Sequence, residues 1–316
     1  MRILLAVDGS RSSERARDLV AALPWHEDVQ VRVASVAPSP TELIGAPWTG
    51  LVVPDLERIE LEILQSHRDA LDLAEREIRS AHAEIGVEAI LLRGRAATEI
   101  VDEAQRMEAD LVVVGHRGRG RWESVLLGSV AAEVVDQAPC PVLVARDERL
   151  GPVVLADDGS SMARAAEGLL IRWPIFARLP ITVVAVAEDG FPYASAVAPL
   201  VYSEALEGYA KSVADDRQST VAECEGVAGR LRAARLEAVA EVHHGDAAQE
   251  IIATATRHGA GLIVIGTRGR TGLRRLLLGS VARKVLLHAP CSVLVVRGGA
   301  SPALVDRERE VVSAFG

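Results

Sequence analysis

The second half of this chain of 316 residues repeats the first half. The stretch ILLAVDGS at 3–10 returns as VVLADDGS at 153–160, and ADLVVVGHRGRG at 109–120 returns as AGLIVIGTRGRT at 260–271. The offset is 150 residues for the first match and 151 for the second. An offset this long and this constant predicts two copies of one domain, rather than a solenoid of short repeats. We place the domains at 1–148 and 149–298, followed by a tail at 299–316.

Each copy alternates short aliphatic segments with longer amphipathic ones. Strands are expected near 2–7, 29–36, 87–92, 110–115 and 141–145, and helices near 11–22, 55–84, 97–107 and 129–137. The second copy follows at the same offset. Alternation of this kind predicts an α/β fold in which helices cover both faces of a parallel sheet. The last strands, CPVLVAR and CSVLVVR, are apolar and would lie at sheet edges, so the two copies could pair there within one chain.

Ligands of such folds bind beyond the carboxyl ends of the strands. Asp8, Val36 and Gly115 stand at predicted strand ends in the first copy, as do Asp158, Val186 and Gly266 in the second. After Gly115 the first copy reads G-x2-G-x9-G-S, with Gly118, Gly128 and Ser129, and a helix begins there. Glycines allow a ligand to approach the main chain, and a helix N-terminus favours phosphate. Ser129 could cap this helix or donate its hydroxyl to a phosphate.

The G-x2-G-x9-G-S spacing, together with Asp-Gly-Ser after the first strand, resembles the ATP-binding branch of the universal stress protein family. The resemblance covers both halves of the chain. It implies two tandem Rossmann-like domains of the adenine nucleotide alpha hydrolase-like type, each with a five-stranded parallel sheet of order 3-2-1-4-5. It also implies ATP as the ligand, with or without Mg²⁺, at one site per domain.

The resemblance assigns a role to each matching position. Asp8 and Asp158 would bind the ribose, and Val36 and Val186 would meet the adenine through the main chain. Gly115 and Gly266 would pass close to the ribose. The remaining positions would surround the phosphates: Arg117, Gly118, Gly128, Ser129 and Val130 in the first copy, and Arg268, Gly269, Gly279, Ser280 and Val281 in the second.

Several of these residues have a second interpretation. Asp-Gly-Ser is also good turn and helix-cap chemistry, and loop arginines can simply keep a loop solvated. Gly94 and Gly245 begin strand-to-helix turns that the family places near the nucleotide, although a tight turn alone would explain them. Asp157 has no counterpart in the first copy, and strand alternation directs it away from the site.

Composition limits the classes of function. The net charge of −9 argues against general nucleic-acid binding, and no apolar run is long enough for a membrane span. Three scattered cysteines fit a reducing, cytoplasmic compartment.

The sequence contains no P-loop. It also lacks a general base that recurs in both copies, because Glu123 is matched by Arg274 and His116 by Thr267. We therefore expect an ATP-binding regulator or sensor of stress. A slow ATPase and a nucleotide-independent scaffold are the alternatives, and protein partners and a homodimer are left open.

Overall fold

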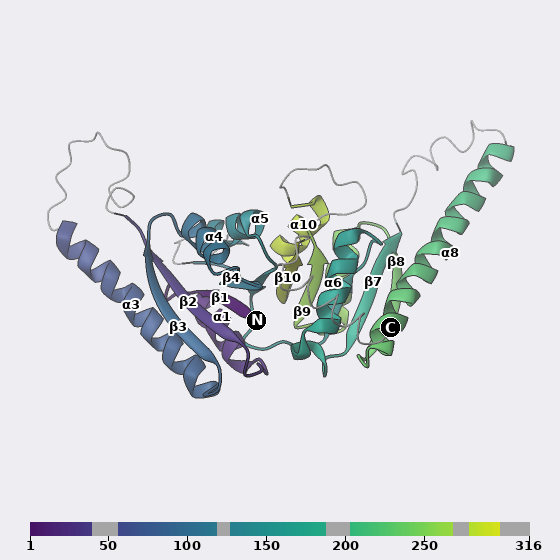
Figure 1. Ribbon diagram of the computed structural model, residues 1–316. Helices are drawn as coiled ribbons and strands as arrows, with labels where there is room; N and C mark the ends of the chain where they lie inside the picture. The colour runs from purple at the N-terminus through teal and green to yellow at the C-terminus, as the bar shows by residue number, and fades with distance from the viewer. Residues whose placement is uncertain (40–55, 119–126, 188–202, 268–277, 298–316) are drawn as a thin grey trace, which may run out of the picture. The chain divides into compact units, whose positions relative to one another are not determined.

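The computed structural model describes residues 1–39, 56–118, 127–187, 203–267 and 278–297 (Figure 1). Contacts between residues divide the chain into two compact units. The first contains Met1–Leu150 and also the last strand, whereas the second contains the chain from Gly151 through the last helix. We describe each unit by itself, with element labels as in Figure 1.

In its described residues, the first unit contains five parallel strands and four helices. Its strands are β1 (Arg2–Ala6), β2 (Gln30–Ala37), β3 (Gly86–Arg93), β4 (Leu111–Gly115) and β5 (Val142–Ala145). Its helices are α1 (Arg11–Ala22), α3 (Leu56–Ala81), α4 (Ala96–Arg106) and α5 (Ser129–Gln137). The order β3-β2-β1-β4-β5 confirms the 3-2-1-4-5 sheet expected for the first copy.

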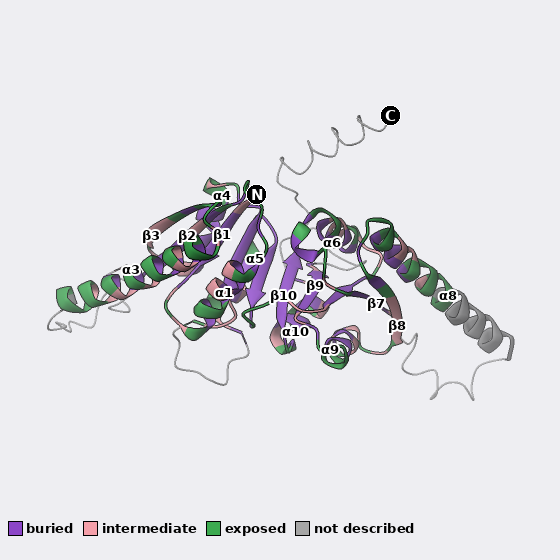
Figure 2. Cartoon of the chain, turned by 90° about the horizontal axis from the view of Figure 1, so that it is seen from below, coloured by how far each residue is buried: buried purple, intermediate pink, exposed green. Residues whose placement is uncertain are grey.

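The helices form two layers on the sheet of this unit. Helices α1 and α3 contact each other on one face, and α4 and α5 contact each other on the other (Figure 1). The central strands are aliphatic and buried: Ile3, Leu4 and Leu5 have no exposed surface (Figure 2). A central parallel strand covered on both faces needs such a continuous apolar run, which explains why the aliphatic pattern predicted these strands well.

The second unit repeats this plan. Its strands are β6 (Val153–Ala156), β7 (Ile181–Ala187), β8 (Ala238–His244) and β9 (Leu262–Gly266), in the order β8-β7-β6-β9. Its helices are α6 (Ser161–Arg172), the short 3₁₀ helix η1 (Pro174–Phe176), α8 (Ser203–Ala233), α9 (Ala247–Arg257) and α10 (Ser280–His288). These four strands follow the order of β3-β2-β1-β4 in the first unit.

Strand β10 (Ser292–Val296) pairs antiparallel with β5, with Leu294 opposite Leu143. Its contacts therefore assign it to the first unit, although its sequence belongs to the second repeat. The Ser292 hydroxyl also accepts a hydrogen bond from the Arg146 N–H, at 3.0 Å. The pairing satisfies the main chain of two apolar edge strands, which would otherwise expose unpaired peptide groups.

Within the part of the chain that the structure describes, no helix combines the length and the apolar character needed to cross a membrane. Each copy has a long segment after its second strand, at 37–54 and 187–204. These two segments fall mostly outside the described residues, and the whole tail does as well.

Candidate functional site

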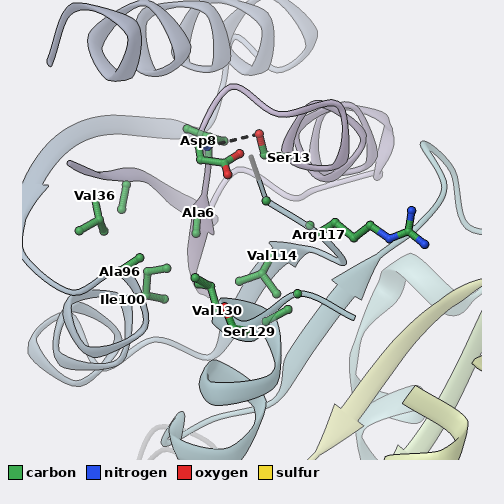
Figure 3. Close-up of a pocket in the computed structure, with 16 residues that line it drawn as sticks. Ala6, Asp8, Ser13, Val36, Ala96, Ile100, Val114, Arg117, Ser129 and Val130 are labelled. Carbon is green, nitrogen blue, oxygen red and sulfur yellow. Dashed lines mark hydrogen bonds between the residues drawn. The ribbon is translucent and has the colours of Figure 1, made fainter. Parts of the chain in front are cut away.

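A cavity of about 390 Å³ opens in the first unit at the carboxyl ends of β1, β2 and β4 (Figure 3). The structure brings together in its wall all eight residues that the sequence singled out in the first copy: Asp8, Val36, Gly115, Arg117, Gly118, Gly128, Ser129 and Val130. They come from segments as far apart as β1 and α5. Their convergence follows from the parallel sheet, whose strand ends share one edge.

One end of the cavity is apolar. Val36 from β2 and Ile100 from α4 line it, together with Ala34 and Ala96 (Figure 3). The carbonyl of Ala34 accepts the Val7 N–H at 2.9 Å, so it points toward β1. Alternate residues of a strand direct their peptide groups to the same side, so Val36 turns its N–H and C=O the same way, beyond the end of β1. This end of the cavity thus offers a small apolar wall with peptide groups beside it.

The other end of the cavity is polar. The Asp8 side chain accepts the Ser10 N–H through Oδ1 at 2.9 Å, which is the turn chemistry allowed for in the sequence. Its second oxygen, Oδ2, lies 3.0 Å from where a Cβ on Gly118 would stand. One carboxylate thus shapes the turn with one oxygen and faces the Gly118 segment with the other. The turn role and a ligand role are therefore compatible for Asp8.

Helix α5 begins at this polar end. Gly128 occupies the N-cap position and has no side chain to bond the first N–H groups of the helix. Ser129 is the first helical residue. This corrects the expectation that Ser129 could cap the helix, because a cap lies one residue earlier, outside the helical turn. The Gly128 N–H donates to the His116 carbonyl at 2.8 Å, which fixes the distance between the two ends of the loop. The N–H groups of the first turn of α5 face the same region as the Ser129 hydroxyl.

Arg117 lines the cavity, yet its guanidinium extends away from it (Figure 3). The Arg117 N–H donates to the Ser12 hydroxyl at 3.0 Å, and Nε is buried without a hydrogen-bond partner in the described residues. The structure therefore does not bring this charge to the cavity, contrary to the phosphate role expected for the side chain. Arg119 and Arg121 lie outside the described residues.

Behind the same loop, the Nδ1 atom of His116 lies 2.7 Å from the Ser12 hydroxyl. Burial and then the charge of Arg146 lower the pKa of His116 to about 4, so the ring is neutral at physiological pH. The Ser12 hydroxyl thus connects the start of α1 to the segment that follows β4, on the side away from the cavity.

Gly115 has a packing reason to be glycine. A Cβ on Gly115 would lie 2.6 Å from the carbonyl carbon and oxygen of Ser12. Gly266 repeats this in the second unit, where a Cβ would lie 2.6 Å from that of Met162. From the sequence, both positions were expected to be glycine so that a ligand could come close to the main chain. The structure shows a second reason, because the strand and the helix that crosses it lie too close together for a side chain.

The second unit holds its described site positions in the same arrangement. Asp158 accepts the Ser160 N–H at 3.0 Å, and the Gly279 N–H donates to the Thr267 carbonyl at 2.8 Å, as the matching groups do in the first unit. Val186 lies near the end of β7, Gly266 ends β9, and Ser280 and Val281 begin α10. Arg268 and Gly269 lie outside the described residues.

Sequence reasoning missed several residues of the cavity wall. Ser13 lines it and accepts the Asp8 N–H at 3.3 Å, while Ile100 contributes apolar surface from α4. The signal for Ser13 was its place three residues after the helix cap Ser10. A smaller cavity of about 280 Å³ adjoins at Val36 and Ala96 and is also lined by Gly94, whose φ of +134° favours glycine.

The three cysteines are buried and are not joined in disulfides, and burial raises the pKa of Cys140 to about 12. Buried thiols of this kind usually pack as small apolar side chains. In the described part of the chain, no group of three or more His, Cys, Asp or Glu residues is placed to hold a metal ion.

Comparison with known proteins decides the family. The model of the universal stress protein family matches residues 1–146 and again residues 150–297. The chain belongs to the universal stress protein family. The two matches also account for the internal repeat as two tandem domains of this family.

Named relatives and solved structures agree with this assignment. Universal stress protein Rv2005c of Mycobacterium tuberculosis is 27% identical over 313 residues, which cover 93% of this chain and 96% of the relative. Universal stress protein MJ0531 of Methanocaldococcus jannaschii is 53% identical over 148 residues, 46% of this chain and 81% of that protein. A universal stress protein structure from Archaeoglobus fulgidus covers 94% of this chain and 98% of its own, with a TM-score of 0.63 at 19% identity, and supports the fold.

Proposed function

We propose that this universal stress protein is an ATP-binding regulator, with one nucleotide site in each unit. The observation that carries the proposal is the cavity of the first unit, which joins an apolar wall, the Asp8 oxygen that faces Gly118, and a helix N-terminus without a side-chain cap. These three surfaces match, in order, a nucleobase, a ribose and a polyphosphate.

The adenine would lie at the apolar end, against Val36, Ala96 and Ile100. A flat base fits a narrow aliphatic slot, and the peptide groups of Val36 would satisfy its polar edge. Recognition by main-chain groups restricts the base through geometry, without requiring a particular side chain. Asp8 Oδ2 would accept a hydrogen bond from a ribose hydroxyl.

The phosphates would lie between Gly118 and the start of α5. The N–H groups of the first turn of α5 and the Ser129 hydroxyl would donate to phosphate oxygens, and the helix end carries a partial positive charge. In this arrangement the main chain, rather than Arg117, holds the phosphates.

We favour binding over hydrolysis as the activity. His116, which lies two residues before Gly118, turns its ring to Ser12 and to the Ala145 carbonyl, and it is absent from the described cavity wall. Glu123 lies outside the described residues. Hydrolysis needs a positioned group that orients the attacking water. The free state of all three cysteines supports a cytoplasmic location.

Equilibrium dialysis of ATP against the full chain tests the proposal. We expect about two ATP per chain for the wild type and about one for Gly118→Glu, because the new side chain adds bulk and charge where phosphate would lie. Gly86→Glu is the matched control, because a Cβ there meets only the Gln30 side chain, at 3.7 Å. Equal ATP binding by all three proteins would contradict the site assignment.

A further inference from the structure

The two units differ in charge at one position in the wall of the candidate site. Val7 lines the cavity of the first unit, and its counterpart in the second unit is Asp157. Asp157 immediately precedes Asp158, the counterpart of Asp8. The second unit therefore carries two consecutive carboxylates where the first carries one.

The extra carboxylate is buried. Asp157 is 8% exposed, and its Oδ1 accepts the Gly159 N–H at 3.1 Å. Burial raises the pKa of Asp157, and the neighbouring carboxylates Asp158, Glu167 and Glu223 raise it further. Its surroundings are thus already rich in negative charge, and a polyanion nearby would add to the repulsion.

Positive charge close to Asp157 is already engaged. Arg230 on α8 is influenced by the charge of Asp157, but its guanidinium makes two hydrogen bonds to Glu167, at 2.6 and 2.9 Å. On the same helix, the pKa of the Cys224 thiol is raised to about 11 by burial and by Asp157. An ionised Asp157 therefore acts on its surroundings as a net negative charge.

We propose that Asp157 is a specificity-determining residue that makes the two nucleotide sites unequal, with polyphosphates bound more weakly in the second unit than in the first. This inference rests on the proposed ATP sites and adds that their affinities for ATP differ. The carboxylate does not contact the ligand. It acts through its charge from a buried position directly before Asp158, where screening by water is weak.

The ranking has a consequence for the ligand class of the second unit. Each phosphate adds charge that Asp157 repels, so the penalty should be largest for ATP, smaller for AMP and absent for adenosine. The first unit, with Val7 at this position, should lack this added penalty. A chain with unequal sites would respond to nucleotide over a wider concentration range than a chain with two equal ones.

The test isolates the second site in the full chain at pH 8, an alkaline pH chosen because burial raises the pKa of Asp157 and the proposal concerns its ionised form. Gly118→Glu silences the first site, and ATP affinity is then compared in Gly118→Glu, Gly118→Glu/Asp157→Val and Gly118→Glu/Asp157→Asn by isothermal titration calorimetry. We expect either neutralising change to strengthen ATP binding about three- to tenfold, with little effect on adenosine. Asp157→Asn keeps the shape and the hydrogen-bonding capacity, so it separates charge from packing.

The outcomes separate the two claims. Unchanged ATP affinity in both double variants, with the first site of the wild type still binding ATP, would overturn the ranking and leave the proposed function in place. Equal strengthening of ATP and adenosine binding would also overturn it, because a packing change would then be the cause. No ATP binding by the wild type at millimolar concentration would overturn the proposed function itself. Circular dichroism of each variant checks that it is folded.

Discussion

The first and second units share their strand-end glycines and helix-capping serines but differ in the contacts around them. Ser10 and Ser160 both cap the helix after the first strand of their unit. The two residues that follow Arg11 are Ser12 and Ser13, whereas their counterparts are Met162 and Ala163. The first unit thus uses two hydroxyls to connect α1 to the cavity wall, at the N–H groups of Asp8 and Arg117, and the second offers none at these positions.

An ion pair between matching helices also differs between the two units. Arg95 pairs with Glu133 at 3.0 Å between α4 and α5, and the matching residues Asp246 and Lys284 pair at 2.8 Å with the charges reversed. The polarity of such a pair matters little as long as its partners complement each other. The strand-end Asp, the glycines and the helix start do not vary in this way. The comparison indicates that the backbone frame of the site, rather than its charged surroundings, is what both units must keep.

Replacing the strand-end glycines should have the largest effect on the free energy of unfolding, because it disturbs the backbone that both sites share. Gly115→Ala should cost roughly 2–4 kcal/mol of unfolding free energy, because its Cβ would meet the main chain of Ser12, which can move only with α1. Gly266→Ala should cost less, because there the closest atom is the Met162 Cβ and the nearest main-chain atom lies at 3.2 Å.

Urea denaturation measures both glycine variants, with Gly86→Ala as a control in open surroundings. If Gly266→Ala proved the more destabilising, or if neither differed from Gly86→Ala, close packing would not be the reason for these glycines.

Exchanging the polarity of the ion pair should give the smallest effect. Arg95→Asp/Glu133→Lys gives the first unit the arrangement of the second, where Asp246 both pairs with Lys284 and caps α9 through the Gln249 N–H. Arg95 provides no such cap to α4. We expect a gain of about 0.5–1 kcal/mol in unfolding free energy, mainly from the cap.

The single variant Arg95→Asp separates the contribution of the cap from that of the pair. It should fall below the double variant, because Glu133 would then face a like charge. If the double variant were less stable than the single one, the two charges of this pair could not be exchanged without loss of stability.

The sequence predicted most of the fold, because its signals are local or repeated. The aliphatic runs predicted the strands to within about two residues, as is typical where burial on both faces demands them. The site positions of the first copy came together as expected, since parallel strand ends must share an edge. The pairing of β10 with β5 was foreseen as a possibility, because both last strands are apolar and were expected at sheet edges. That β10 would thereby group with the first unit was not foreseen, because the sequence does not show which contacts outweigh the others.

What the sequence could not give was the direction of side chains. Arg117 recurs at a site position, yet its guanidinium leaves the cavity, and no spacing rule shows which way a loop side chain turns. The reason for Gly115 was also hidden, because the crossing of α1 over β4 is a tertiary contact. The start of α5 at Ser129 was predicted correctly, but the cap, one of two roles left open for Ser129, falls to Gly128, and such one-residue distinctions are where local rules are least certain.

Amide hydrogen exchange of the full chain with and without ATP shows directly whether the cavity of the first unit binds the nucleotide. We expect slower exchange, in the first unit, at the end of β2 around Val36, in the turn at Asp8–Ser10 and at the first turn of α5. The outer face of α3 should not change. Saturating ATP that leaves these three segments unchanged, or that protects a different surface of this unit, would contradict the assignment of the cavity as an ATP site.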